Sequence, residues 1–441
     1  MTLYTTNIIS KLSTVGTSNG ELSDHNGISF EILIEMASML SINYGRTGTF
    51  IFRNRDCIRL FTLNYHGLRV SLPSRFVSIF GTSRTSNWTK AVSDAEKLVG
   101  YPTSFMSLRC LLSDELSNVA IHIRKLLGTR HPLLKTARGF LDNGKHSLQT
   151  RGLVVLLISK AAGPSPNPSD ICKEQDMISG IYPSQRSLAE IIEMIHMASL
   201  IHKGVVNLED IQPGDGPRKD MEFGNKLAVL SGDFLLASSC TALAKLNNTK
   251  VVEIISKAIG NLMEAEFTAL KDKSGNPVLP RNVTFSDWIE QTFLSSGSLL
   301  AEGCRAAMEL ANHSESVKEA AFTFGKNMAL AQQMADDIGP FLDPNQGLTN
   351  INITSAPIIQ HVESHQKDIH DSLFNSSEGI EPKQVLKMVK SGSAIQECTE
   401  LCREYGQRAI HSLDLFSDSD AKTALINIIR AATNEQQLGA R

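Results

Sequence analysis

Two adjacent carboxylates, Asp336 and Asp337, are the residues of this sequence best suited to chemistry. They end a segment of helical periodicity, just before Ile338-Gly339-Pro340. The negative end of a helix dipole disfavours a carboxylate by about 0.3 kcal/mol or more, so we expect a cation beside them. A bound Mg²⁺ or a basic side chain from another helix would serve. The alternative is an ordinary exposed acidic pair.

Other candidate groups carry less chemistry. Asp233 lies inside an otherwise apolar helical segment and needs a partner, which can be structural or chemical. His361 and His365 are one helical turn apart but lack the glutamate of an HExxH site. Cys398 and Cys402 have the same spacing, and we interpret them as buried thiols.

From residue 88 onward, the sequence pattern indicates that the elements positioning these residues are helices. The sequence has no GxGxxG motif after a strand and no GxxxxGK[ST] motif. The apolar run Leu153–Ile158 is short enough for a strand, but we interpret it as a buried helix because no second strand signal is near. We expect a capping box at Ser187–Glu190. The sequence therefore predicts an all-α bundle with helices over 88–99, 113–127, 150–160, 187–203, 224–246, 250–272, 285–311, 316–338, 361–374, 382–391, 393–416 and 419–434.

Composition narrows the classes of partner. The 441 residues contain 43 Lys and Arg against 46 Asp and Glu, a net charge of -3. This balance argues against a nucleic acid as the main partner. No apolar run approaches the roughly 20 residues of a transmembrane helix, so we expect none. Seven scattered cysteines favour a reducing compartment.

The first 85 residues differ from the rest in composition, which divides the chain into a leader (1–85) and one helical domain (86–441). Between Met36 and Ser93 eight residues are basic and only Asp56 is acidic. An Arg-rich, Ser-rich, acid-poor leader is typical of mitochondrial import and predicts a mitochondrial, matrix location. Four acidic residues precede Met36, so translation could start at Met36 or Met39, and an extension without a targeting role is the alternative.

Three segments in order resemble one family, the trans-polyprenyl diphosphate synthases. They are Glu193–His202, Gly224–Ala237 and Gln333–Asp337. The resemblance extends from about residue 88 to the C-terminus and implies a large antiparallel helical bundle around a central cavity. Members of this family extend an allylic diphosphate with isopentenyl diphosphate. Val99–Asn118 and Arg151–Lys160 are similar, more narrowly, to the partner subunits of decaprenyl-type synthases.

The first aspartate-rich motif of that family is degenerate here. Active synthases carry DDxxD, whose carboxylates hold Mg²⁺ ions against the allylic diphosphate. The matching positions read Lys203-Gly204-Val205-Val206-Asn207. An ammonium group at Lys203 opposes binding of a divalent cation by charge alone. The resemblance therefore implies no catalytic residue at Lys203, Gly204 and Asn207.

The remaining family motifs are also incomplete. The arginine pair reads Gln212-Pro213, the mid-chain Lys-Thr pair reads Ser295-Ser296, and the GKR motif survives at best as Gly144-Lys145-His146. In the second motif Pro340 replaces the third aspartate, so Asp336 and Asp337 could hold one Mg²⁺ weakly. Substrate-binding residues are not identified.

The resemblance implies a non-catalytic but required subunit of a heteromeric synthase. Such a complex, a heterotetramer, makes the ubiquinone side chain from farnesyl or geranylgeranyl diphosphate and isopentenyl diphosphate. Mg²⁺ and the isoprenyl diphosphates would bind to the homologous catalytic subunit, which we expect to pack on the small-residue helix from Gly224 to Ala244. The alternatives are an independently active prenyltransferase that uses Asp233, Asp336 and Asp337, or a protein that binds an isoprenoid without chemistry.

Overall fold

The chain divides into two compact units, Met1–Ser83 and Arg84–Arg441. A computed structural model describes the following residues: 49–54, 57–62, 87–100, 126, 129–134, 136, 150–167, 175–212, 214–270, 279, 282–342, 352–364 and 382–433. Most of the helix predicted over 113–127, the Gly144-Lys145-His146 remnant and His365 lie outside the described residues.

The first unit contains a β-hairpin that the sequence reading did not anticipate. Strand β1 (Thr49–Asn54) pairs with β2 (Cys57–Thr62) in antiparallel register, from Thr49 opposite Thr62 to Asn54 opposite Cys57. Both strands are rich in β-branched and aromatic residues, which favour extended backbone. Two residues separate the strands, the usual length for a tight hairpin.

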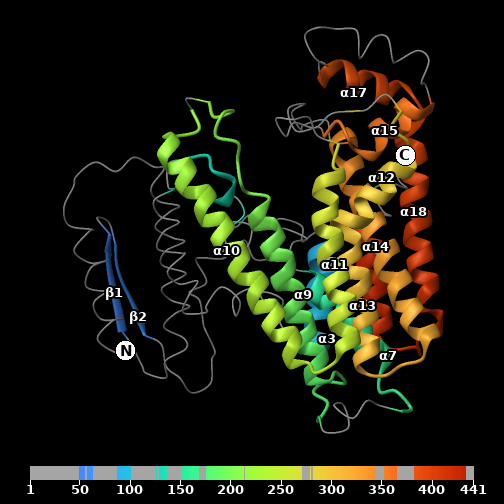
Figure 1. The fold of residues 1–441 in the computed structure, drawn as a ribbon. Coiled ribbons are helices and arrows are strands. Elements are labelled where there is room, and N and C mark those ends of the chain that lie inside the picture. The colour runs from blue at the N-terminus through green and yellow to red at the C-terminus, as the bar shows by residue number, and fades with distance from the viewer. Residues whose placement is uncertain are drawn as a thin grey trace. The chain divides into compact units, whose positions relative to one another are not determined.

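Every named element of the second unit is a helix, and outside these elements the described residues form turns, loops and one isolated β-bridge between Ile178 and Ile181, which confirms the all-α prediction (Figure 1). Its elements are α3 (Asn87–Val99), α7 (Thr150–Ala162), α9 (Pro183–His202), α10 (Arg218–Lys245), α11 (Thr249–Thr268), α12 (Phe285–Thr292), the π-helix η4 (Phe293–Gly297), α13 (Ser298–Leu310), α14 (Glu315–Leu342), α15 (Ala356–Ser364), α17 (Pro382–Ser391), α18 (Ala394–Ser412), the 3₁₀ turn η6 (Leu413–Leu415) and α19 (Asp420–Ala432).

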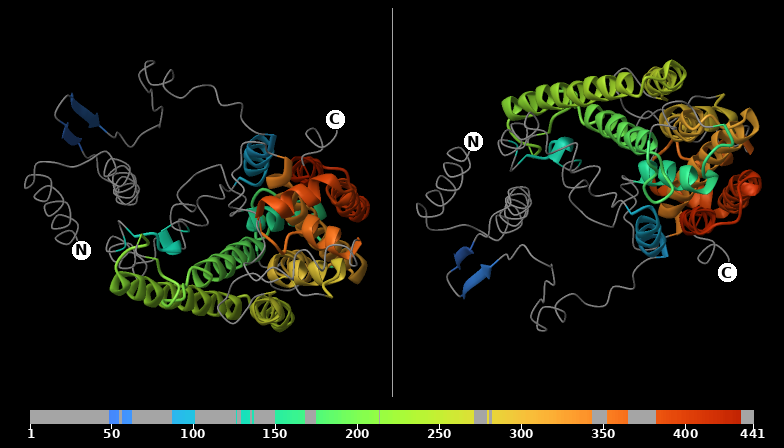
Figure 2. Two further views of the ribbon diagram at one scale, coloured as in Figure 1. Left: turned by 90° about the horizontal axis from the view of Figure 1, so that it is seen from above. Right: turned by 90° about the horizontal axis from the view of Figure 1, so that it is seen from below.

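The central helices of this unit are apolar on more than one side because they are surrounded by other helices. Helix α14 packs against both α13 and α18, and α7 contacts α3, α9, α13 and α19. All six side chains of the run Leu153–Ile158 are buried in α7, as predicted for a core helix. Helix α10 lies along the outer side of α9 in both views of Figure 2.

Three large apolar clusters hold the described part of the bundle together, beside a small one at Tyr182 and Ala311. The largest joins α7 to α9, α11, α13 and α19. A second lies between the C-terminal half of α14, α15 and the first half of α18. A third, between α9 and α10, also includes Leu126, Leu133 and Leu134. The last turns of α9 and of α14 therefore belong to different clusters.

Several predicted helix ends were wrong: α10 begins at Arg218 and not at Gly224, α11 ends at Thr268 and not at residue 272, and α15 begins at Ala356 and not at His361. Proline explains two further differences. Helix α9 begins at Pro183 and not at Ser187, because proline at the first helical position needs no N–H partner and Gln185 Oε1 accepts from the Tyr182 N–H at 3.2 Å. Helix α14 continues through Pro340 to Leu342. In the last turn a proline removes a single helical hydrogen bond.

Candidate functional site

Lys203 occupies the C-cap of α9, where the first aspartate-rich motif would begin. Its N–H donates to the Ser199 carbonyl at 3.0 Å, and its Nζ lies 3.3 Å from Glu266 Oε1 of α11. Both side chains are about 40% exposed. The ammonium is thus the cation at this position, and its partner is a carboxylate of a neighbouring helix.

Gly204 and Asn207 belong to a turn that α10 holds in place. Asn225 accepts from the Val206 N–H at 2.8 Å and donates to the Val206 carbonyl at 2.7 Å. The Asn207 side chain is directed to its own loop, where Nδ2 donates to Asp210 Oδ2 at 2.9 Å. The turn therefore offers no carboxylate at the positions that would bind metal.

A buried histidine fixes Asn225 in turn. His131 Nδ1 accepts from the Leu133 N–H at 3.1 Å, so its proton is on Nε2, which donates to Asn225 Oδ1 at 3.2 Å. Burial lowers the pKa of His131, which keeps the ring neutral. A side chain at Gly224 would collide with this ring, because its Cβ would lie 2.4 Å from His131 Cδ2.

Asp233 finds its partner in His202, the last residue of α9. His202 Nε2 lies 3.2 Å from Asp233 Oδ1, and the aspartate side chain is 62% exposed. The ring fits against α10 because position 232 is glycine, where a Cβ would lie 2.2 Å from Nε2. The predicted partner is therefore present, although Asp233 is exposed and not buried.

Three charged or polar groups meet in the core between α7 and α9. Arg151 Nη1 donates to His196 Nε2 at 2.9 Å, and the Gly152 N–H donates to Glu193 Oε1 at 2.7 Å. Burial raises the pKa of Glu193 to about 7, and burial next to the Arg151 and Lys203 charges lowers that of His196 well below its ordinary value. This cluster is enclosed and serves the packing of α7 on α9.

Asp337 in the second motif is held by neutral donors. Its Oδ2 accepts from Trp288 Nε1 at 2.9 Å and from the Ala356 N–H at 2.8 Å, and its Oδ1 accepts from Gln333 Nε2 at 2.9 Å. Among the described residues no lysine or arginine lies within ion-pair distance of Asp336 or Asp337. The expected protein cation is replaced by three N–H groups, of which those of Trp288 and Ala356 join α14 to α12 and α15.

Asp336 is the freer carboxylate of the pair. It is exposed, yet desolvation and the adjacent charge of Asp337 raise its pKa to about 6. Burial also raises the pKa of Asp337, against the effect of its three donors. A cation near Asp336 would find one carboxylate that is not already engaged.

The site where the family carries a Lys-Thr pair lies in the π-helix η4. Ser295 and Ser296 both direct their hydroxyls to the Thr292 carbonyl, at 3.5 and 3.0 Å. Such π-helical turns often lie at functional sites. Here the hydroxyls satisfy the helix itself and present no positive charge.

The donor set does not fit a cluster of Mg²⁺ ions. Within the described part of the chain no three His, Cys, Asp or Glu residues group closely enough to hold a metal ion. Asp233 therefore does not join Asp336 and Asp337, as an independent active site would require. No reaction step can be derived from a metal held by these residues.

Sequence spacing did not reveal the two polar clusters that organise the end of α9. The contacts of Arg151 with His196 and of His131 with Asn225 join residues 45 and 94 positions apart. The available signal was Glu193 and His196 at i and i+3 in a helix that is otherwise apolar. A buried acid on such a face requires partners.

Comparison with known proteins places the site in context. The polyprenyl synthetase family model matches residues 134–390. The all trans-polyprenyl-diphosphate synthase PDSS2 of Rattus norvegicus is 49% identical over 353 residues, which cover 79% of this chain and 88% of that protein. The human PDSS2 is 48% identical with the same coverage. A probable mitochondrial hexaprenyl pyrophosphate synthase of Yarrowia lipolytica is 30% identical, covering 81% of this chain and 91% of that protein.

Solved structures share the fold. The polyprenyl synthase of Caulobacter crescentus, solved with calcium and isoprenyl diphosphate, aligns with a TM-score of 0.58 and 19% identity over 79% of this chain and 98% of that one. The geranylgeranyl pyrophosphate synthase of Lactobacillus brevis aligns with a TM-score of 0.56 and 17% identity over 77% and 96%. By family model, identity and fold, the chain belongs to the polyprenyl synthetase family.

Proposed function

We propose that this chain is the non-catalytic but required subunit of a heteromeric polyprenyl diphosphate synthase. The observation that carries the proposal is Lys203, which stands at the position of the first aspartate of the motif and pairs with Glu266 at 3.3 Å. An intact synthase needs carboxylates there to bind Mg²⁺. The cation-binding and catalytic work would then fall to a homologous subunit that keeps DDxxD.

An exposed apolar surface on α10 and α11 supports the proposal that this chain binds a second subunit. Of the eight large hydrophobic side chains exposed among the described residues, four lie on these two helices: Val229, Leu230, Met263 and Phe267. Phe267 is 90% exposed. Large exposed apolar patches of this kind are typical of protein interfaces.

The spacing on both helices suits packing against other helices. Among the exposed residues of α10, one stripe has intervals of three and four: Lys226, Leu230, Asp233, Ala237, Cys240 and Ala244. A similar stripe among the exposed residues of α11 contains Ser256, Gly260, Met263 and Phe267. A 3–4 spacing with small residues permits close helix–helix approach. We call these two stripes the α10/α11 face.

The same open face explains why α10 is unusually apolar. It is long and apolar enough to cross a membrane by length and composition, with only 39% of its most apolar window buried. Core helices pass the same test, and α10 packs along α9 through Gly224 and Gly232. We therefore assign the remaining apolar face to a second subunit rather than to lipid.

The proposed role as a partner subunit also implies a location, a domain division and a set of substrates for the complex. We infer that residues 1–85 act as a mitochondrial leader and that residues 86–441 form the synthase-like domain in the matrix. The partner would bind Mg²⁺, farnesyl or geranylgeranyl diphosphate and isopentenyl diphosphate, and the heterotetramer would supply the ubiquinone side chain. Relatives whose names place them in mitochondria support the location.

Substitution of the α10/α11 face tests the proposal. We expect Leu230→Asp to abolish co-purification with the DDxxD-bearing homologue from the same organism, because it places a charge in a desolvated contact. The matched control is Leu415→Asp, which alters a 62% exposed leucine on η6. If the Leu230→Asp chain co-purifies as fully as the control, this face is not the contact.

A further inference from the structure

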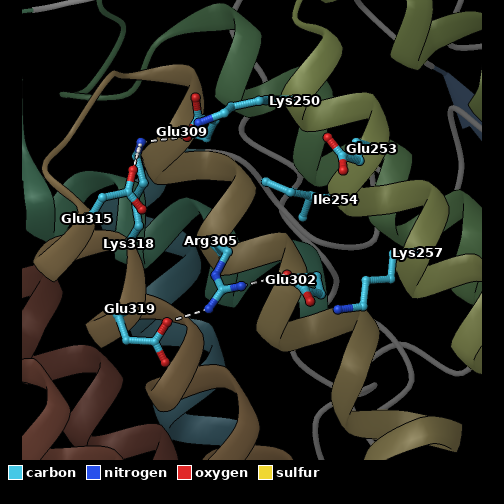
Figure 3. Close-up of a pocket in the computed structure, with 10 residues that line it drawn as sticks. All are labelled: Lys250, Glu253, Ile254, Lys257, Glu302, Arg305, Glu309, Glu315, Lys318 and Glu319. Carbon is cyan, nitrogen blue, oxygen red and sulfur yellow. Dashed lines mark hydrogen bonds and ion pairs between the residues drawn. The ribbon is translucent and has the colours of Figure 1, made fainter.

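A charged pocket lies where α11, α13 and α14 meet, away from the residues described above (Figure 3). Its volume is about 460 Å³, within the usual range for small-molecule sites. Lys257 is nine residues before Glu266, or about 14 Å along the α11 axis, so the pocket is separate from the Lys203 pair. It is lined by Lys250, Glu253, Ile254, Lys257, Glu302, Arg305, Glu309, Glu315, Lys318 and Glu319.

The basic side chains on α13 and α14 are each shared between two carboxylates. Lys318 Nζ lies 2.6 Å from Glu309 Oε2 and 2.8 Å from Glu315 Oε1. Arg305 binds Glu319 closely and lies 3.7 Å from Glu302 Oε2, beyond hydrogen-bond distance. In the described part of the chain, neither Lys318 nor Arg305 donates a hydrogen bond to Glu302 Oε2.

Glu302 is the group left incomplete by this arrangement. The residue is only 4% exposed, and its buried Oε2 has no hydrogen-bond donor. Figure 3 shows the carboxylate between Arg305 and Lys257 at the wall of the pocket. A buried acceptor without a donor is costly, and a ligand N–H would remove that cost. Burial raises the pKa of Glu302 although the nearby charges of Arg305 and Lys257 lower it, so neither charge fully offsets the desolvation of the carboxylate.

The α11 side of the pocket has charged side chains that can turn to solvent or contact a ligand. Lys250, Glu253 and Lys257 are exposed, and none forms an ion pair among the described residues. Long lysine stems can turn their ammonium groups to solvent. Five glutamates face four basic residues in the pocket lining, so the pocket carries one excess negative charge.

We propose that this pocket binds a small organic diamine, with one primary ammonium donating to Glu302 Oε2 and the other facing Glu253. A primary ammonium supplies the N–H donors that the buried oxygen lacks. A metal ion fits less well, because the described residues group no three metal-binding side chains. The excess negative charge favours a ligand that is cationic overall.

Calorimetric titration of the full chain with putrescine tests this site. We expect saturable binding to one site, weakened by salt as for other exposed charges. Glu302→Gln should weaken it about tenfold or more, because a charged hydrogen bond is lost. Lys257→Gln should tighten it, since a competing ammonium is removed. Glu264→Gln, an exposed change on α11 outside the pocket, should leave the affinity unchanged.

Several outcomes would overturn the proposal. One is no saturable binding of putrescine, and another is equal affinity in the Glu302→Gln chain. If Lys257 itself completes Glu302, Lys257→Gln would lower the melting temperature and would not tighten binding. Binding of inorganic phosphate that is lost in Lys250→Gln and Lys257→Gln would identify an anion site instead. Should Glu302→Gln fail to fold, the Lys257→Gln titration decides.

Discussion

Position 203 differs from a metal-binding aspartate in both its charge and its partner. The Lys203 ammonium is paired with Glu266, and the turn that follows is bracketed by Asn225. In the second motif, Asp337 is engaged by three neutral donors, of which those of Trp288 and Ala356 tie α14 to α12 and α15. In the proposed function, these positions serve structure and not catalysis.

Restoring the missing carboxylates should therefore not restore turnover. We expect the triple variant Lys203→Asp, Gly204→Asp, Asn207→Asp to remain inactive alone, because Ser295 and Ser296 still present no positive charge for a diphosphate. Incorporation of labelled isopentenyl diphosphate into product measures this. Appreciable turnover by the triple variant would show that the first motif alone was limiting.

Glu193 gives a pH-dependent prediction. Folding raises its pKa from 4.5 to about 7, so the folded chain binds more protons than the unfolded chain between these values. The contribution of Glu193 to stability is therefore lost as pH rises from about 4.5 to about 7, and it levels off above that. Relative to the unsubstituted chain, Glu193→Gln should gain stability with pH, by about 1.4 kcal/mol per unit of pKa difference.

Urea unfolding at pH 5 and pH 8 measures this difference. Glu264→Gln, an exposed change on α11, is the control and should show no pH-dependent gain. A free-energy difference between the Glu193→Gln and unsubstituted chains that is the same at both pH values would mean that Glu193 does not titrate in this range.

Helix α10 is positioned on α9 by two glycines at points of close approach. Gly224 faces the His131 ring and Gly232 faces the His202 ring. The third apolar cluster fills the space between the same two helices. Because its inner side is fixed in this way, α10 presents its 3–4 spaced outer residues as a continuous stripe.

Alanine substitutions at Gly232 and Gly260 distinguish the effect of packing on stability from the effect of helix propensity. Gly232→Ala should destabilise the chain by about 1–3 kcal/mol, since its Cβ would lie 2.2 Å from His202 Nε2. Gly260→Ala on α11 has open space around the Cβ and should stabilise by about 0.5–1 kcal/mol. Equilibrium unfolding in urea compares the two, and equal effects would contradict the packing argument.

Local patterns predicted the elements better than their ends. The helix over 382–391 has the predicted bounds in the structure, and Leu153–Ile158 is a core helix as expected. The ends at Pro183 and Pro340 were missed because a proline is compatible with the first and last turns of a helix. The predicted helix 285–311 is continuous only through the π-helix η4, which no spacing rule indicated.

For the candidate site, the positions that differ from the family motifs could be predicted from the sequence. The residues that contact them could not. Sequence comparison of motifs identifies Lys203, but its contact with Glu266 depends on how α11 packs beside α9. The bonds of Asp337 to Trp288 and Ala356 likewise join segments whose proximity only the fold determines. Long-range pairs of this kind leave no periodic signal in a sequence.

At the scale of the whole molecule, the helical unit keeps the family's fold, while Lys203, Gly204 and Asn207 stand at the positions of the first aspartate-rich motif. The bundle retains three apolar clusters and aligns with a catalytic synthase at a TM-score of 0.58. The altered first motif and the exposed α10/α11 face both lie on or beside α9, α10 and α11. A loss of metal ligands alongside an open apolar face is the combination expected of a subunit that works through a partner.

The most direct test is a prenyltransferase assay on this chain alone and on this chain co-expressed with its DDxxD-bearing homologue. Mg²⁺, farnesyl diphosphate and labelled isopentenyl diphosphate are supplied in both cases. The account predicts that only the co-expressed sample makes product and that the two chains purify together. Product formation by the purified chain alone would contradict it, because Lys203 would then be compatible with catalysis.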